Sequence, residues 1–251
     1  MAFSRGPTVI KDGIVFSIDP ASSKSYPGST NVYELTRYGG TTTATFPPFG
    51  QLSGGTTVTV PTTGSTTKVF GFDGTNDSLL FANNSATAPL PVNFTSSAFS
   101  IESWVKLQQT GSNTIAVIVT RGNPLCDGCD GGFNTMFTNS STISVRFDAT
   151  GGSNIASVSY NSSSYDFRDD KFHHIVGLRD GTNIKLYLDG VEVATNNNDN
   201  NVNVNVEDHL YISGWSSYRG EMEVGPVRIY NKALSATEVS INYNAQKHRF
   251  I

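Results

Sequence analysis

The sequence predicts an all-β fold, a two-sheet antiparallel sandwich that ends in one short C-terminal helix. Short runs rich in β-branched and aromatic residues recur along the chain, bounded by Gly, Asn, Asp or Pro. Only one stretch, near the C-terminus, has a capping motif followed by helical spacing. Hydrophobic residues make up 37% of the 251 residues, enough for a packed core. We therefore expect a single domain over residues 1–251, with an N-terminal arm at 1–8.

The predicted strands begin at residues 13–19. Residues 68–73 and 77–82 are expected to pair as a hairpin, because Gly74 and Asn76 between them take positive φ at little cost. The remaining strands are predicted at similar short spacing, at 56–60, 99–107, 114–120, 133–137, 142–147, 155–160, 172–178, 184–188 and 210–213.

Hydrophobic periodicity predicts which side chains face the core. Residues 99–107 alternate with a period of two, which places Trp104 on the face opposite the mainly apolar one. Residues 114–120 are continuously apolar, as in a strand that is covered on both sides. The alternation of Asn and Val over 201–206 predicts buried valines and solvent-facing asparagines.

The helix is predicted to begin after Ser235. Ser235 and Glu238 have the capping-box spacing, in which each side chain bonds the backbone N–H of the other residue. Four residues then follow at helical spacing: Val239, Asn242, Tyr243 and Gln246. Many strands with a single terminal helix favour a sandwich over alternating α/β units.

Five segments, in order along the chain, resemble the laminin-G-like members of the concanavalin A-like jelly-roll superfamily. They are 12–19 (DGIVFSID), 72–77 (FDGTND), 99–105 (FSIESWV), 172–190 (FHHIV to KLYLDG) and 225–250 (beginning GPVRIYNKALS). The resemblance implies a concanavalin A-like jelly-roll sandwich over nearly the whole chain. Such folds include lectins, hydrolases, lyases and structural modules, so function has to be argued from a site.

The opening and closing segments, with residues 24–29 (KSYPGS), resemble in particular laminin-G-like proteins of tailed phages, often of marine hosts. This resemblance implies a virion structural protein made in the host cytoplasm, either a capsid decoration or a tail or fibre surface protein. Its role would be particle cohesion or host-surface adhesion. Its partners would be other virion proteins, host-surface glycans and further copies of itself in a homo-oligomer.

Charge and hydropathy argue against several other partners. The formal net charge is −4 and Lys and Arg form no run, so no nucleic-acid partner is expected. No apolar stretch is long enough to span a bilayer, and the first residues lack the apolar segment of a secretory signal. We therefore expect no membrane insertion and no signal peptide.

The candidate ligand-binding site is an aromatic loop. Trp215, Tyr218 and Arg219 follow a predicted strand. Sugar recognition uses aromatic faces beside hydrogen-bonding groups, so this loop suits a glycan. Tyr160, Asn161 and Tyr165 form a second, weaker cluster. The structural alternative is that Trp215 packs on the sandwich edge or in a subunit contact.

We find no catalytic constellation and expect no enzymatic activity. His173 and His174 are adjacent in a predicted strand, so their imidazoles point to opposite faces and cannot meet at one ligand. Glycoside hydrolysis needs two carboxylates roughly 5–10 Å apart. Glu221 and Glu223 are the one close acid pair on a strand, and two exposed glutamates beside a turn are the simpler interpretation.

No metal ion or cofactor is expected. Cys126 and Cys129 supply only half of the ligands that a structural zinc ion takes, so free thiols or a small disulfide are preferred. Calcium stays an open alternative. The resembled family places an acidic calcium ligand just before the VRIY strand, where this chain has Gly and Pro at 225–226. The remaining oxygen donors would be Asp19, Asp73 and Asp77.

Three functions remain open on this evidence. The preferred one is the virion structural protein, because the chain combines the phage resemblance with a neutral polar surface and no catalytic constellation. The alternative is a carbohydrate-binding module that uses the aromatic loop. The third is a glycoside hydrolase or polysaccharide lyase acting through Glu221 or Glu223.

Overall fold

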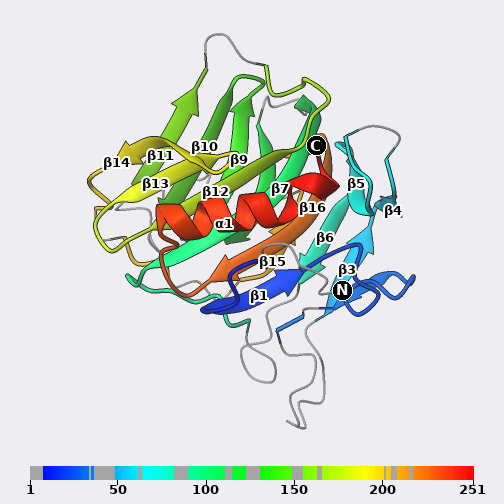
Figure 1. The fold of residues 1–251 in the computed structure, drawn as a ribbon, viewed down its shortest axis with the longest axis horizontal. Helices are drawn as coiled ribbons and strands as arrows, with labels where there is room; N and C mark the ends of the chain where they lie inside the picture. Colours follow the sequence, from blue (N-terminus) through cyan, green and yellow to red (C-terminus); the bar gives the residue numbers. More distant parts are fainter. Residues whose placement is uncertain are drawn as a thin grey trace, which may run out of the picture.

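The computed structural model describes residues 8–33, 35–36, 49–61, 64–81, 90–110, 115–122, 131–148, 155–162, 166–200, 202–204, 208–214 and 217–251. The strands in this part of the chain form two antiparallel eight-stranded sheets, and one α-helix lies across the outer face of one sheet (Figure 1). We call this sheet the helix-side sheet and the other the opposite sheet. The predicted all-β sandwich with one C-terminal helix is confirmed.

The helix-side sheet contains the long central strands. Its order is β14 (Val191–Asn196), β13 (Ile184–Leu188), β12 (His173–Arg179), β7 (Phe99–Thr110), β16 (Gly220–Tyr230), β5 (Val69–Asp73) and β4 (Thr57–Thr59). The first strand, β1 (Ile14–Ile18), also pairs with β16. The register of β16 shifts between Val224 and Val227, so that 221–224 pair with β5 and 227–230 pair with β1.

The strands of the opposite sheet are three to eight residues long. Its order is β11 (Ile155–Asn161), β10 (Thr142–Asp148), β9 (Gly132–Asn139), β8 (Ala116–Gly122), β15 (Leu210–Ile212), β6 (Ser78–Phe81), β3 (Phe49–Ser53) and β2 (Asn31–Tyr33).

The main core lies between the two sheets. Phe16 of β1 meets Phe81 of β6 edge to face, with ring centroids 4.9 Å apart. Phe99 of β7 packs against Phe147 of β10 at a centroid distance of 4.9 Å. All four of these side chains are fully buried. Burial of a side chain of this size is worth roughly 1.5–3 kcal/mol, so each of these contacts stabilises the packing of one sheet on the other.

A smaller core lies on the outer face of the helix-side sheet, under α1 (Ala236–Gln246) and the 3₁₀ turn Lys247–Arg249. Trp104 faces outward from β7, as its alternation predicts, and stacks on Phe250 with centroids 4.8 Å apart. The capping box is also confirmed, since the Glu238 N–H donates to Ser235 Oγ and the Ser235 N–H donates to the Glu238 carboxylate.

Other predictions from periodicity hold. Every residue of β8 is buried, as expected for a strand covered on both sides. Within the predicted alternation over 201–206, Val202 and Val204 are buried while Asn203 is exposed, although 202–204 form no strand. Residues 201 and 205–206 lie outside the described residues. No helix in the described ranges has the length and apolarity needed to cross a membrane.

The predicted hairpin between residues 68–73 and 77–82 is wrong. β5 pairs with β4 and β16 in the helix-side sheet, whereas β6 pairs with β3 and β15 in the opposite sheet. The connection is still a tight turn, with Gly74 at φ +75° and the Asp73 N–H donating to Asp77 Oδ2 at 2.9 Å. Turn-forming residues predict a reversal, but they do not specify whether the next strand pairs with the previous one or crosses to the facing sheet.

Candidate binding site

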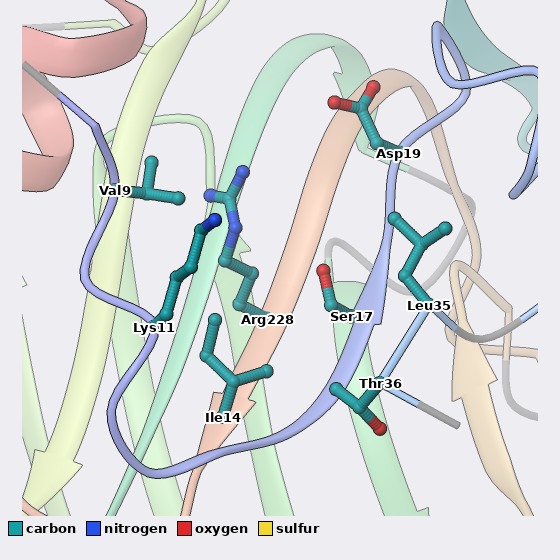
Figure 2. Close-up of a pocket in the computed structure, with 8 residues that line it drawn as sticks. All are labelled: Val9, Lys11, Ile14, Ser17, Asp19, Leu35, Thr36 and Arg228. Atoms are coloured by element: carbon teal, nitrogen blue, oxygen red, sulfur yellow. The ribbon is translucent and has the colours of Figure 1, made fainter. Parts of the chain in front are cut away.

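A pocket of about 440 Å³ opens on the outer face of the helix-side sheet, over the pair β1 and β16 (Figure 2). Its described lining residues come from the N-terminal segment before β1, from β1 itself, from the segment after β2 and from β16. They are Val9, Lys11, Ile14, Ser17, Asp19, Leu35, Thr36 and Arg228.

The floor of the pocket is a cross-strand pair. Ser17 of β1 lies directly opposite Arg228 of β16, so the two side chains share the outer face of the sheet. Their strand neighbours Phe16 and Ile229 belong to the core between the sheets. Strand alternation thus places two polar side chains at the base of the pocket within otherwise apolar strands.

One wall is the segment that carries Val9 and Lys11. The Ile10 N–H donates to Asn242 Oδ1 of α1 at 2.7 Å, and the Tyr230 hydroxyl donates to the Ile10 carbonyl at 3.3 Å. The N-terminal segment is therefore held against both the helix and β16.

The facing wall carries Leu35 and Thr36. The Leu35 N–H donates to the Ser17 carbonyl at 2.8 Å. The Thr36 hydroxyl donates to the Val15 carbonyl at 3.3 Å. Hydrogen bonds to β1 thus hold this wall in place.

Arg228 is held in position by a buried carboxylate. Its Nη1 donates to Glu102 Oε1 at 3.1 Å and to Gln246 Oε1 of α1 at 2.9 Å. Glu102 lies directly opposite Arg228 on β7 and is fully buried. The same carboxylate hydrogen-bonds His174 Nε2 at 3.0 Å and accepts from the Tyr230 hydroxyl at 2.9 Å.

The environment of Glu102 stabilises its charged form. Burial by itself would raise the pKa of this carboxyl, but the Arg228 charge and the hydrogen bonds from His174 and Tyr230 outweigh burial and lower the pKa to about 2. Asn242 Nδ2 also donates to Glu102 Oε2 at 2.8 Å. Glu102 is therefore an ionised, fully bonded support for Arg228.

The charged side chains of the pocket lining differ in whether they have an ion-pair partner. Asp19 accepts a bidentate pair of hydrogen bonds from Arg249, so its charge is compensated. Arg228 is compensated by Glu102. Lys11 is exposed and makes no ion pair with any residue of the described ranges. The lining therefore carries one surplus positive charge, next to aliphatic surface from Val9, Ile14 and Leu35.

The predicted aromatic loop lies elsewhere. Trp215 is outside the described residues. Tyr218 is half-buried, and its carbonyl accepts from the Val117 N–H of β8 at 3.1 Å, so it lies beside a strand of the opposite sheet. Arg219 lies close to the buried carboxyl of Asp77, whose pKa is raised by burial and lowered by the Arg219 charge, with a net rise.

The second predicted cluster also lies on the opposite sheet. Tyr160 and Asn161 end the edge strand β11, which β10 and β9 separate from β8. Tyr160 packs partly against the main core and Asn161 is exposed, whereas Tyr165 lies outside the described residues. Neither predicted cluster contributes to the pocket in Figure 2.

The two adjacent histidines point to different environments, as predicted. His174 lies in the buried group around Glu102, under the helix. His173 Nδ1 is 2.9 Å from Asp189 Oδ2, and its ring meets Phe167 of the main core edge to face. Burial tends to lower the pKa of His173, but Asp189 and Asp169 outweigh it and raise the pKa.

The expectation that Glu221 and Glu223 are exposed is wrong, because both are partly buried on β16. Glu223 Oε2 is 2.8 Å from Lys106 Nζ, and Lys106 in turn lies 3.0 Å from Asp170 Oδ1. Alternation places Lys106 on the outer face of β7 with Trp104. Lys106 lies directly opposite Glu223 of β16 and is buried, so β7 supplies the cation that pairs with this carboxylate.

The acids considered for calcium are used in other contacts. Asp19 bonds Arg249, while Asp73 Oδ1 accepts from the Thr75 N–H at 2.8 Å. A side chain at Gly225 would bring its Cβ within 2.8 Å of Phe250 Cζ, so packing accounts for glycine there. The described residues contain no group of three or more His, Cys, Asp or Glu side chains able to hold a metal ion. Cys126 and Cys129 lie outside the described residues.

The pocket residues Lys11, Ser17 and Arg228 belong to no sequence motif that indicates binding. One usable signal was Arg228 itself, a charged residue between the apolar residues Val227 and Ile229 of a predicted strand. Alternation of β1 could also have placed Ser17 and Asp19 on one face. No local pattern, however, predicts that β1 pairs with a strand more than two hundred residues later.

Comparison with known proteins gives a family and a set of similar structures. Residues 73–240 match the family model described as concanavalin A-like lectin/glucanases superfamily. No curated protein sequence matches the chain significantly.

The similar structures include binding domains of clostridial toxins. The binding domain of Paraclostridial Mosquitocidal Protein 1 matches with a TM-score of 0.66 and 15% identity over 93% of this chain and 52% of that one. The receptor binding domain of botulinum neurotoxin C/D mosaic serotype matches at 0.67 and 15% over 94% and 52%. The botulinum neurotoxin serotype D ligand binding domain in complex with N-acetylneuraminic acid matches at 0.66 and 14% over 94% and 52%. The chain spans about half the length of these structures, and identities this low show a shared fold alone.

Proposed function

Because the chain belongs to the concanavalin A-like lectin/glucanases superfamily, we propose that it is a lectin-like module that binds a carbohydrate without hydrolysing it. We place the binding site in the pocket over β1 and β16. The observation that carries this proposal is the pocket itself, a cavity of about 440 Å³ with aliphatic side chains in its walls and polar side chains in its floor. Hydrogen bonds to Glu102 and Gln246 hold the Arg228 side chain of that floor in position.

The lining suits the two kinds of surface on a sugar ring. Val9, Ile14 and Leu35 offer apolar contacts for ring C–H groups. Lys11 and Arg228 offer N–H donors for ring hydroxyls. The described part of the lining uses aliphatic rather than aromatic side chains, so the proposal does not depend on the aromatic loop around Tyr218.

Several contacts favour binding over catalysis. Asp19 is the single carboxylate in the described lining, and Arg249 bonds both of its oxygens. Hydrolysis of a glycosidic bond ordinarily needs a pair of carboxylates. Elsewhere on the outer face, the Glu223 carboxylate is 2.8 Å from the buried ammonium group of Lys106 and so already has a partner within the protein.

A glycan array with a steric variant tests this function. Val9→Trp would fill the pocket from its wall, and Val191→Trp places the same side chain at a 64% exposed position on β14 as the matched control. We expect wild-type protein to bind a defined subset of glycans, also in EDTA because no metal is invoked. The Val9 variant should bind at least about tenfold more weakly and the Val191 variant normally. Binding to no glycan, or equal binding by both variants, would contradict the proposal.

A second candidate is display of this module on the virion of a tailed phage, as a structural or adhesion protein. It is favoured by the phage resemblance of the opening and closing segments. In the structure these two segments lie together, since Asp19 bonds Arg249 and β1 pairs with β16. The similar structures are toxin domains, so this role rests on sequence resemblance. Mass spectrometry of purified particles should detect the chain in several copies, and its absence from particles would exclude the role.

A further inference from the structure

The hydrogen bonds of the Arg228 guanidinium group indicate what kind of ligand group the pocket binds. Nη1 is occupied by Glu102 and Gln246. Nε and Nη2 make no hydrogen bond to any residue in the described ranges. These two atoms form the edge of the guanidinium whose N–H groups run parallel, the arrangement that matches the two oxygens of a carboxylate.

Arg228 also has little freedom to find other partners. Arg228 is only 5% exposed, and its carboxylate partner Glu102, on the neighbouring strand β7, is fully buried. A donor edge held in a partly desolvated place gains more from a charged acceptor than from a neutral hydroxyl.

Lys11 adds a second cation at the same pocket. Figure 2 shows its side chain extending along the pocket in the same direction as that of Arg228. With Asp19 already neutralised by Arg249, the lining keeps one surplus positive charge. A ligand with one negative charge would balance this surplus charge, whereas a neutral ligand would leave it uncompensated.

We infer that the pocket recognises an acidic sugar, whose carboxylate lies between Lys11 Nζ and the Nε–Nη2 edge of Arg228 and whose ring contacts Val9, Ile14 and Leu35. This inference rests on the proposed function, because it names the class of carbohydrate bound at the same site. The Ser17 hydroxyl, opposite Arg228, lies on the same floor.

Matched pairs of methyl glycosides test the charge preference by titration monitored with protein NMR. Methyl glucuronide and methyl glucoside differ only in a carboxylate against a hydroxymethyl group, as do the galacturonide and galactoside. We expect at least one uronide to bind about tenfold or more tightly than its neutral counterpart, and this difference should shrink with added salt.

Two variants locate the effect. Lys11→Gln replaces an exposed lysine by an uncharged side chain of similar length. It should weaken uronide binding about fivefold, and it should weaken binding of the neutral glycoside less than that of the uronide. Lys171→Gln, at another exposed lysine, should change neither.

The outcomes separate the inference from the proposed function. Neutral glycosides that bind as tightly as their uronides would overturn the acidic preference and leave carbohydrate binding intact. A methyl glucoside 6-sulfate that binds more tightly than the glucuronide would overturn the assignment to a carboxylate. Absence of binding by every glycoside, together with an array without signal, would overturn both.

Discussion

Asp19 and Arg249 form a bidentate ion pair, with Nη1 2.9 Å from Oδ2 and Nη2 2.8 Å from Oδ1. The pair joins the end of the first strand to the turn that follows the C-terminal helix. It therefore ties the end of β1, which contributes Ser17 and Asp19 to the pocket lining, to a C-terminal turn that is not part of that lining.

Arg249→Ala should lower the free energy of unfolding by about 1–2 kcal/mol, because it removes two charge-assisted hydrogen bonds at a mostly buried site. Arg168→Ala is the matched control, since its pair with Asp166 is 43% and 48% exposed. The control should change stability by less than about 0.5 kcal/mol. Urea unfolding measures both, and equal losses would show that the Asp19 pair has no special role.

Glu102→Gln should be far more costly, with a loss of about 3–5 kcal/mol in the free energy of unfolding. The variant preserves the shape of the side chain but leaves the buried Arg228 cation without its counter-charge. It should also weaken uronide binding, because Arg228 is no longer held at the pocket floor. A variant as stable as wild type would refute the supporting role of this carboxylate.

The stabilising effect of the Glu102 charge should also be detectable as a dependence of stability on pH. The pKa of Glu102 is about 2 in the folded protein against an ordinary value of 4.5, so the folded state binds fewer protons than the unfolded state between these values. The stability that Glu102 contributes is complete above about pH 4.5 and is lost as the pH falls toward 2. Between pH 4.5 and 2, the free energy of unfolding should fall more steeply for wild type than for Glu102→Gln. Equal pH dependence in the two proteins would contradict the low pKa of Glu102.

Gly225→Ala should destabilise the packing under the helix by about 1–3 kcal/mol. The added Cβ would lie 2.8 Å from Phe250 Cζ and 3.2 Å from Trp104 Cβ, so the stacked rings have to move. Gly55→Ala is the control, because its nearest neighbour would be Asp77 Oδ1 at 3.4 Å. Thermal unfolding of both variants measures the difference. Equal effects would mean that this stack tolerates the extra volume.

Much of the fold could be predicted because short sequence patterns determine strand faces and helix ends. The period of two in β7 correctly placed Trp104 on the outer face, and the Ser235 and Glu238 capping box marked the start of the helix. The crossing from β5 to β6 could not be predicted in this way, because the turn at 74–76 is compatible with either sheet. Which sheet follows depends on pairing with β15 and β16, far away in the chain.

The candidate site was much less predictable. Aromatic side chains in a loop predict a site at Tyr218, whereas the described lining of the pocket is aliphatic, hydroxyl-bearing and charged. Ser17 and Arg228 meet only because the first and last strands pair. Residues that a long-range strand pair brings together leave no short motif, so sequence reasoning without the topology had no means of combining them.

A crystal structure of the chain with methyl glucuronide, or with the galacturonide if that binds more tightly, tests the central claim most directly. We expect a sugar in the pocket over β1 and β16, with its carboxylate within hydrogen-bonding distance of Arg228 Nε and Nη2 and of Lys11 Nζ. A sugar bound instead beside Tyr218 or Tyr160, or an empty pocket at saturating ligand, would contradict it.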